Sequence, residues 1–113
     1  MNKEEKQQVQ DATVYRIEKA FGKVKGVYRV SKRVIDEEVN AYHVTVKPSN
    51  NESVPLDLWC DCPGFRRQKF PQIEHKHVRM ALHYQSIGEP VHADYKFTGT
   101  GRNTIIQYNG RWI

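Results

Sequence analysis

Cysteine is scarce in this chain of 113 residues, which contains only Cys60 and Cys62, separated by one residue. Small secreted domains that depend on disulfides need more cysteines at wider spacings, so that class of fold is excluded. Two neighbouring thiols in a chain without a secretory signal favour metal binding in a reducing compartment. We therefore expect an intracellular, cytoplasmic protein.

Long apolar stretches are also absent. No run of about 18 apolar residues is present, which excludes a membrane-spanning helix and leads us to expect no membrane partner. The N-terminal residues MNKEEKQQ are followed by no apolar run, so we expect no secretory signal. The chain is nevertheless too rich in Val, Ile, Tyr and Trp to be disordered throughout. Its length fits a single domain, residues 1–113, since domains commonly contain ~100–200 residues.

Acidic residues are fewer than basic ones. The chain has 18 Lys and Arg against 13 Asp and Glu, which gives a formal net charge of +5. This mild bias is compatible with a phosphate-bearing partner such as nucleic acid, although charge alone does not identify one.

The first 23 residues are predicted to contain a helix, over residues 3–23. Val14, Ile17, Phe21 and Val24 recur at spacings of three and four, which is typical of the apolar face of an amphipathic helix. A second helix is predicted from about residue 75 to residue 85, and it ends before Gly88 and Pro90.

Strands are predicted in the middle of the chain and at its end. The alternating apolar positions are Tyr28, Val30 and Val34, then Tyr42, Val44 and Val46, then Val54, Leu56 and Leu58. A turn at residues 36–38 and a loop at residues 48–53 separate these runs, which favours an antiparallel meander. Asn109-Gly110 is a strong hairpin signal, so residues 91–113 are predicted to form a C-terminal β-hairpin.

The cysteines are followed, after twelve residues, by His75 and His77. Two thiolates and two imidazoles in close pairs form a ligand set that tetrahedral zinc uses. Alternate residues of a strand point to one face, so Cys60 and Cys62 can approach the same ion. On a regular helix, positions two apart diverge by about 200°. We therefore expect His75 in the turn before the second helix and His77 in its first turn, with one zinc ion between the four side chains.

Other interpretations of these residues remain open. Either pair alone is a weak signal, because two small core residues or two unrelated histidines give the same pattern. A strained disulfide between Cys60 and Cys62 is a further alternative, and His83 is the best substitute if His75 is not a ligand.

The motifs together resemble the SWIM zinc-finger family. The segments that carry the resemblance are Tyr42–Val46, with the sequence YHVTV, Leu58–Phe65, with LWCDCPGF, and His75–Leu82, with HKHVRMAL. Members of that family have Cys-x-Cys, a variable spacer and Cys-x-His on a β-β-α scaffold. Cys60, Cys62 and His77 match three of the ligand positions, whereas His75 stands where the family usually has cysteine. The resemblance covers roughly residues 26–84 and implies a zinc-binding core that takes part in DNA binding or protein interaction.

These elements together predict an α+β domain. It would consist of a small antiparallel β-meander, a zinc-pinned β-turn-α unit, an N-terminal amphipathic helix and a C-terminal β-hairpin. Four protein ligands argue for a closed, structural zinc site, because catalytic zinc usually keeps a position open for water. No nucleophile motif, phosphate loop or carboxylate pair is found elsewhere, so we expect no enzyme. A metal-dependent hydrolase, with Glu74 as its base, is the alternative.

A basic surface follows the cysteines and is the candidate nucleic-acid interface, for DNA ahead of RNA. Its residues are Arg66, Arg67, Lys69, Lys76 and Arg79, joined by Arg29 and Arg33 if the first strand of the meander lies beside them. Phe65 and Phe70 interleave with these charges and either stack on bases or pack in the core. Such binding would be electrostatic and sensitive to salt.

The alternative function is that of a protein-interaction adaptor or a regulatory, inhibitory protein. Its candidate surface is the aromatic C-terminal segment, with Tyr95, Phe97, Ile105, Ile106, Tyr108, Trp112 and Ile113. Tyr and Trp are enriched at binding hot spots, and an exposed strand there could pair with a second copy to form a homodimer. The same residues could instead close the core.

Overall fold

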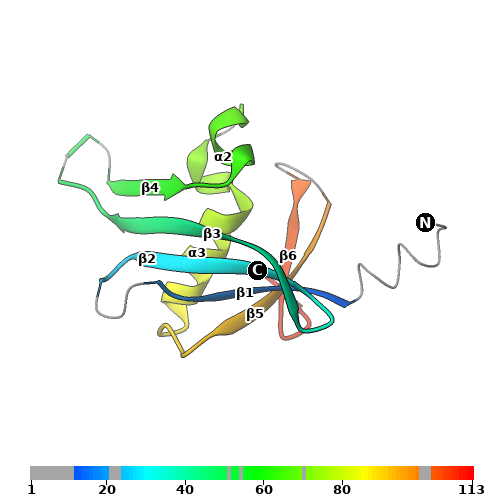
Figure 1. The fold of residues 1–113 in the computed structure, drawn as a ribbon. Coiled ribbons are helices and arrows are strands. Elements are labelled where there is room, and N and C mark those ends of the chain that lie inside the picture. Colours follow the sequence, from blue (N-terminus) through cyan, green and yellow to red (C-terminus); the bar gives the residue numbers. More distant parts are fainter. Residues whose placement is uncertain (1–11, 21–23, 51, 54, 70, 100–102) are drawn as a thin grey trace.

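The computed structural model describes residues 12–20, 24–50, 52–53, 55–69, 71–99 and 103–113. Within them, seven strands form one antiparallel sheet in the order β4-β3-β2-β1-β5-β6-β7 (Figure 1). The strands are β1 Thr13–Lys19, β2 Val27–Val34, β3 Glu37–Pro48, β4 Leu56–Cys60, β5 Ala93–Thr98, β6 Ile105–Tyr108 and β7 Arg111–Trp112. The helices are α2 Pro63–Arg67, the 3₁₀ turn η1 Gln72–Glu74 and α3 Lys76–Ser86.

The architecture is therefore mainly β, and the predicted α+β class is wrong. Only two short α-helices, α2 and α3, have their bounds within the described residues, and the sheet dominates. The predicted N-terminal helix is also wrong over Thr13–Lys19, which forms β1, while residues 3–11 and 21–23 of that prediction lie outside the described residues. Residues 13–17 include Thr, Val, Tyr and Ile, which favour strands, and β1 pairs with β2 on one side and with β5 on the other.

The meander formed by β2, β3 and β4 confirms the predicted alternation of the middle segments from Tyr28 to Leu58, except at Val54, which lies outside the described residues. Val30 and Val44 are buried on the face that contacts α3, and β3 pairs antiparallel with both neighbours. The turn between β2 and β3 differs from the prediction, because it lies at Ile35 and Asp36, with φ of 52° and 65°. Two residues with positive φ make a tight hairpin whose twist matches that of the strands, so Glu37 already belongs to β3.

The core lies between α3 and one face of the sheet (Figure 1). Its fully buried members include Ile17, Tyr28, Val30, Val44 and Val46 from the strands and Val78, Met80, Ala81 and Tyr84 from α3. The rings of Tyr28 and Tyr84 meet edge to face with centroids 5.4 Å apart. The predicted second helix is thus confirmed, and it is fixed to the sheet over its whole length.

The C-terminal segment completes this sheet. Asn109 and Gly110, with φ of 51° and 77°, form the predicted hairpin turn between β6 and β7. Tyr95 and Ile106 are buried, so most of the aromatic segment closes the core, whereas Trp112 remains 68% exposed. None of the helices in the described part of the chain has the length and apolar character that crossing a bilayer requires.

Candidate metal centre

The end of β4 positions the two cysteines. Cys60 is the last residue of the strand, and Pro63 begins α2 directly after Cys62. Between the cysteines, the backbone N–H of Asp61 donates to the carbonyl of His43 at 3.1 Å, and the Asp61 carboxylate accepts from the N–H of His43 at 2.8 Å. Asp61 therefore holds the Cys-x-Cys turn against β3 through both its backbone and its side chain.

The two histidines flank the start of α3. His75 precedes the helix in an extended conformation, with φ −63° and ψ 136°, and His77 is the second helical residue. This break in backbone geometry allows both rings to reach the same point, as the spacing of the two residues predicts.

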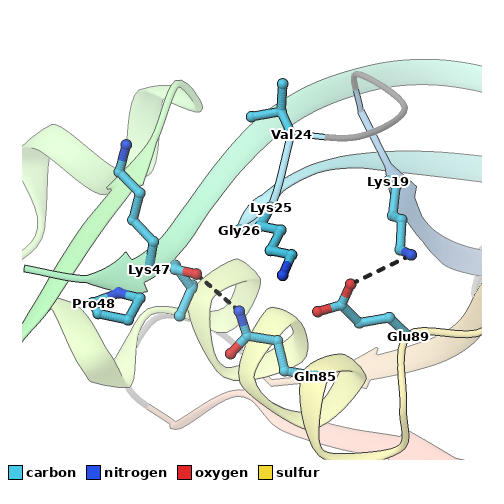
Figure 2. Close-up of a pocket in the computed structure, with 9 residues that line it drawn as sticks. Lys19, Val24, Lys25, Gly26, Lys47, Pro48, Gln85 and Glu89 are labelled. Atoms are coloured by element: carbon cyan, nitrogen blue, oxygen red, sulfur yellow. Dashed lines mark hydrogen bonds and ion pairs between the residues drawn. The ribbon is translucent and has the colours of Figure 1, made fainter.

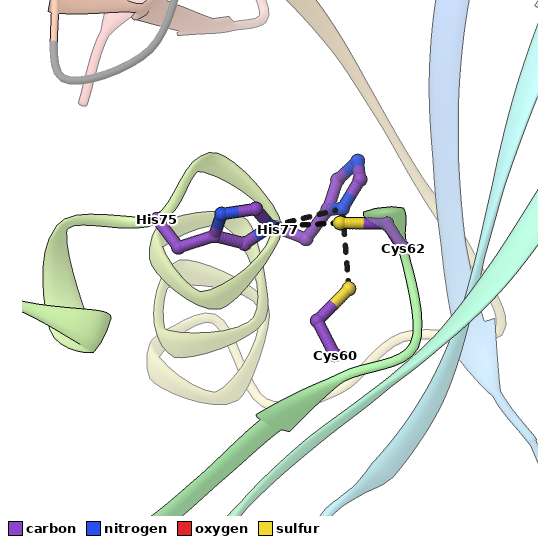
Figure 3. Close-up of side chains that lie close together, drawn as sticks. All are labelled: Cys60, Cys62, His75 and His77. Atoms are coloured by element: carbon purple, nitrogen blue, oxygen red, sulfur yellow. Dashed lines mark hydrogen bonds between the residues drawn. The ribbon is translucent and has the colours of Figure 1, made fainter. Parts of the chain in front are cut away.

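All four side chains converge on one point (Figure 3). Sγ of Cys60 lies 3.3 Å from Nδ1 of His77, and Sγ of Cys62 lies 3.2 Å from Nε2 of His75. The two imidazole nitrogens are 3.4 Å apart, and all four donor atoms lie within 4.8 Å of one another. All four residues are buried. They therefore form a group that could hold one metal ion.

The chemistry of this donor set fits zinc. Zn–S bonds of about 2.3 Å and Zn–N bonds of about 2.0–2.1 Å give a tetrahedron whose edges are about 3.3–3.8 Å. The N–N distance of 3.4 Å matches such an edge, whereas the two S–N distances of 3.2 and 3.3 Å are shorter than the edge of about 3.5 Å that joins sulfur and nitrogen on one zinc ion. A small outward movement of the donors would accommodate the ion, and no acidic side chain belongs to the group.

Electrostatics at the centre favour the metal-binding form of two of the four donors, Cys62 and His77. The hydrogen bond from the Cys60 thiol, assisted by His75 and His77, holds the pKa of Cys62 far below its ordinary value. The same hydrogen bond, together with burial, raises the pKa of Cys60, so this thiol would release its proton on binding a metal ion. Burial lowers the pKa of His77, which favours the neutral imidazole. Thiolate and neutral imidazole are the forms that bind metals.

Aromatic rings surround the centre. Phe65 meets His75 edge to face at 5.2 Å, and Trp59 meets Phe65 at 5.6 Å. Tyr42 stacks on His77 at 5.9 Å. Phe65 is only 4% exposed, so it packs in the core, and Phe70 lies outside the described residues.

One further residue contacts the centre and is not predicted by any sequence motif. Oε1 of Gln68 lies 2.9 Å from Nδ1 of His75, the ring nitrogen that faces away from the cysteines. An N–H donated by Nδ1 to this amide oxygen fixes the tautomer that leaves Nε2 free to bind a metal. Gln68 follows α2 directly, and only the folded chain brings it to His75.

Two alternatives for the cysteines and for the fourth ligand are decided by the structure. Cys60 and Cys62 are free thiols, so they form no disulfide. His83 is hydrogen-bonded to the hydroxyl of Tyr95 at 2.8 Å and is not a member of the metal-binding group. Glu74, the candidate base of a hydrolase, lies in η1 and is not a member of it either.

The predicted basic surface is divided by the fold. Arg66, Arg67 and Lys69 are exposed on α2 and the segment after it, and the Arg66 guanidinium lies 5.0 Å from the centre of the Trp59 ring. The other four contact partners within the chain. Arg29 forms an ion pair with Glu38 at 2.6 and 2.7 Å, and Lys76 lies over the ring of Phe97. Arg33 and Arg79 donate to backbone carbonyls, those of Asp36 and Thr104. The fold therefore leaves Arg66, Arg67 and Lys69 as the three predicted interface residues that project from one short segment.

A hollow of about 680 Å³ lies at the C-terminal end of α3, away from the Cys–His group. Figure 2 shows Lys25 pointing into it and Lys19 reaching Glu89, with an N–O distance of 3.8 Å. The Gln85 amide donates to the carbonyl of Val46 and to the hydroxyl of Tyr28. These bonds fix the C-terminal end of α3 to the sheet, and no residue of the Cys–His group lines this hollow.

Comparison with known proteins identifies no relative of this chain. No family model matches the chain, and no curated protein or solved structure matches it. The functional assignment therefore depends on the chain's own residues.

Proposed function

We propose that this chain is a binding module built around one structural zinc ion, and that it is not an enzyme. The observation that carries the proposal is the convergence of four buried sulfur and nitrogen donors on one point. Four protein ligands satisfy a tetrahedral zinc ion and leave no position for a reacting water. The resemblance to SWIM zinc fingers supports the same interpretation, with His75 in place of the usual cysteine.

Nucleic acid is the partner that we propose, with DNA ahead of RNA. Arg66, Arg67 and Lys69 are exposed on the segment that leaves the cysteines, so the ion would fix the place from which they project. Trp59 is 43% exposed beside Arg66 and offers a ring on which a base could stack. Cationic side chains beside an exposed aromatic ring are the combination that binds single strands without sequence preference.

Fluorescence anisotropy with labelled single-stranded DNA, double-stranded DNA and RNA at low salt tests this partner. We expect the double variant Arg66→Gln/Arg67→Gln to bind at least tenfold more weakly. The plot of log K against log salt should also become less steep by about two, since each phosphate contact contributes about one to the steepness of its slope. The matched control is Lys25→Gln/Lys47→Gln, which removes the same charge at the hollow of Figure 2. Equal loss in both double variants, or no binding by the native chain, would exclude this surface.

A protein partner at the C-terminal edge is the second candidate. β7 is the last strand of the sheet, and it carries Trp112, which is 68% exposed. An edge strand presents unpaired backbone groups to which a strand of a second chain can add. Sedimentation of the native chain and of Trp112→Ala tests this candidate: a dimer that the substitution dissociates supports it, and a monomer in both rules out a homodimer.

A further inference from the structure

We propose that a small hollow beside the metal centre binds an oxyanion such as phosphate. The anion would accept a hydrogen bond from the ring nitrogen of His77 that does not face the cysteines. This inference rests on the proposed function, because it treats His77 as a zinc ligand. It adds a second ligand site and couples that site to the metal.

The hollow has a volume of about 170 Å³ and lies between the sheet and the start of α3. A water molecule occupies about 30 Å³ of liquid, so the space admits a tetrahedral oxyanion with some water. Its polar lining consists of Tyr15, Lys32, Asn40, Tyr42, Lys76 and His77. Tyr15, Lys32 and Asn40 are neighbours across β1, β2 and β3, so they form one row that faces the beginning of the helix.

His77 connects this hollow to the metal centre. Its Nδ1 faces the sulfur of Cys60 at 3.3 Å, and Figure 3 shows Nε2 on the opposite side of the ring. A histidine that binds zinc almost always donates its other N–H to an acceptor. His75 has Gln68 in this role, whereas within the described part of the chain no hydrogen bond involves Nε2 of His77. His77 is only 4% exposed, and it lines this hollow.

The charge of the lining favours an anion as that acceptor. Lys32 and Lys76 both line the hollow, and among the described residues no carboxylate does so. Glu38, two residues before Asn40, is engaged by Arg29 at 2.6 and 2.7 Å. The hollow thus offers ammonium, imidazole and amide donors to one ligand. Lys76 and His77 are also the first two residues of α3, where unpaired N–H groups and the helix dipole add positive potential.

An oxyanion in this position would affect the metal. An acceptor at Nε2 increases the basicity of the ligating imidazole, and loss of such a partner typically lowers metal affinity 10- to 100-fold. Binding is reciprocal, so zinc would increase the affinity for the anion by the same factor.

Calorimetric titration of the zinc-loaded full chain with inorganic phosphate tests the site. We expect saturable binding that is at least tenfold weaker in Lys32→Gln and in Lys76→Gln. Lys47→Gln is the matched control, because it removes one charge seven residues beyond Asn40 on the same strand. Added phosphate should also increase the zinc affinity, measured by chelator competition. This increase should be larger in the native chain and in the control than in Lys32→Gln and Lys76→Gln. Any effect of phosphate on free zinc cancels in that comparison.

The outcomes separate this inference from the proposed function. Zinc content is measured first, and a chain without zinc overturns both. A chain that holds one zinc but binds phosphate weakly, or equally well in all variants, overturns the oxyanion site alone. Where phosphate does bind, a short oligonucleotide that displaces it identifies a nucleic-acid phosphate as the ligand, and failure to displace it identifies a free oxyanion.

Discussion

At the scale of single residues, two residues outside the Cys–His group support the candidate metal centre. Asp61 fixes the Cys-x-Cys turn through two hydrogen bonds to the backbone of His43. Gln68 fixes the ring of His75 through its Nδ1. Asp61 thus restrains the backbone between the two cysteines, and Gln68 restrains the His75 ring. Oriented donors bind metals more tightly.

Replacing a ligand tests the energetic role of the ion. We expect Cys60→Ser to lose zinc and to unfold at least residues 54–84. Binding of a structural zinc contributes apparent free energy of about 10 kcal/mol or more, which is folding free energy where the site forms only on folding. Thermal unfolding followed by circular dichroism measures the effect, and a chelator added to the native chain should reproduce it. Unchanged melting in both experiments would show that the ion does not stabilise this fold.

Replacing Gln68 tests an outer partner of the centre. We expect Gln68→Leu to lower zinc affinity 10- to 100-fold, because His75 loses the acceptor that fixes its tautomer. Competition with a chromogenic chelator measures the affinity. Gln72→Leu is the matched control, since the side chain of Gln72 is exposed on η1. Equal affinity in both variants would remove Gln68 from this role.

At the scale of elements, β1 is the strand on which the arrangement of the sheet depends. It pairs with β2 on one side and with β5 on the other, and so joins the meander to the C-terminal strands. Ile17 on this strand is fully buried against the core, whereas Val14 faces the opposite side of the sheet.

A pair of truncations distinguishes this strand from a helix. We expect Ile17→Ala to lower the free energy of unfolding by about 2–5 kcal/mol, the usual cost of a cavity in a packed core. Val14→Ala should cost less, because Val14 is only partly buried. On an amphipathic helix the two residues would share one face, and both substitutions would then be costly. Denaturant unfolding measures the two values, and equal losses would contradict the strand.

The turn before β2 requires glycine for a steric reason. Gly26 has φ of +80°, and a Cβ there would lie 2.7 Å from the carbonyl oxygen of Val46. We expect Gly26→Ala to destabilise the chain, because both the backbone conformation and the contact are unfavourable for alanine. Gly64→Ala is the control: a Cβ at Gly64 meets nothing within 4 Å, and its helix should favour alanine. Thermal denaturation compares the two, and a similar melting temperature for both would contradict the close contact.

At the scale of the whole molecule, the candidate ion joins segments at the edge of the sheet. β4 is the outermost strand on that side, and the centre links its end to the start of α3. The ion would thus fix α3 to this edge of the sheet, as the buried side chains fix it to the centre. It would also hold α2 and its basic residues in place.

Local patterns in the sequence predict part of this molecule. Alternation predicts β2, β3 and β4, Asn109-Gly110 predicts the last hairpin, and the Cys and His spacing predicts the four residues that converge. The helical prediction failed at Val14 and Ile17 because a three-residue spacing also occurs by chance in a strand, and pairing with β2 and β5 decides the outcome. The contact of Gln68 with His75 could not be predicted, since only the fold brings them together.

X-ray absorption at the zinc edge tests the central claim most directly. The native chain should contain one zinc ion, with two sulfur neighbours at about 2.3 Å and two nitrogen neighbours at about 2.0–2.1 Å. That first shell would identify Cys60, Cys62, His75 and His77 as the ligands. A chain purified without metal, or a zinc shell of oxygen neighbours without sulfur, would contradict the account.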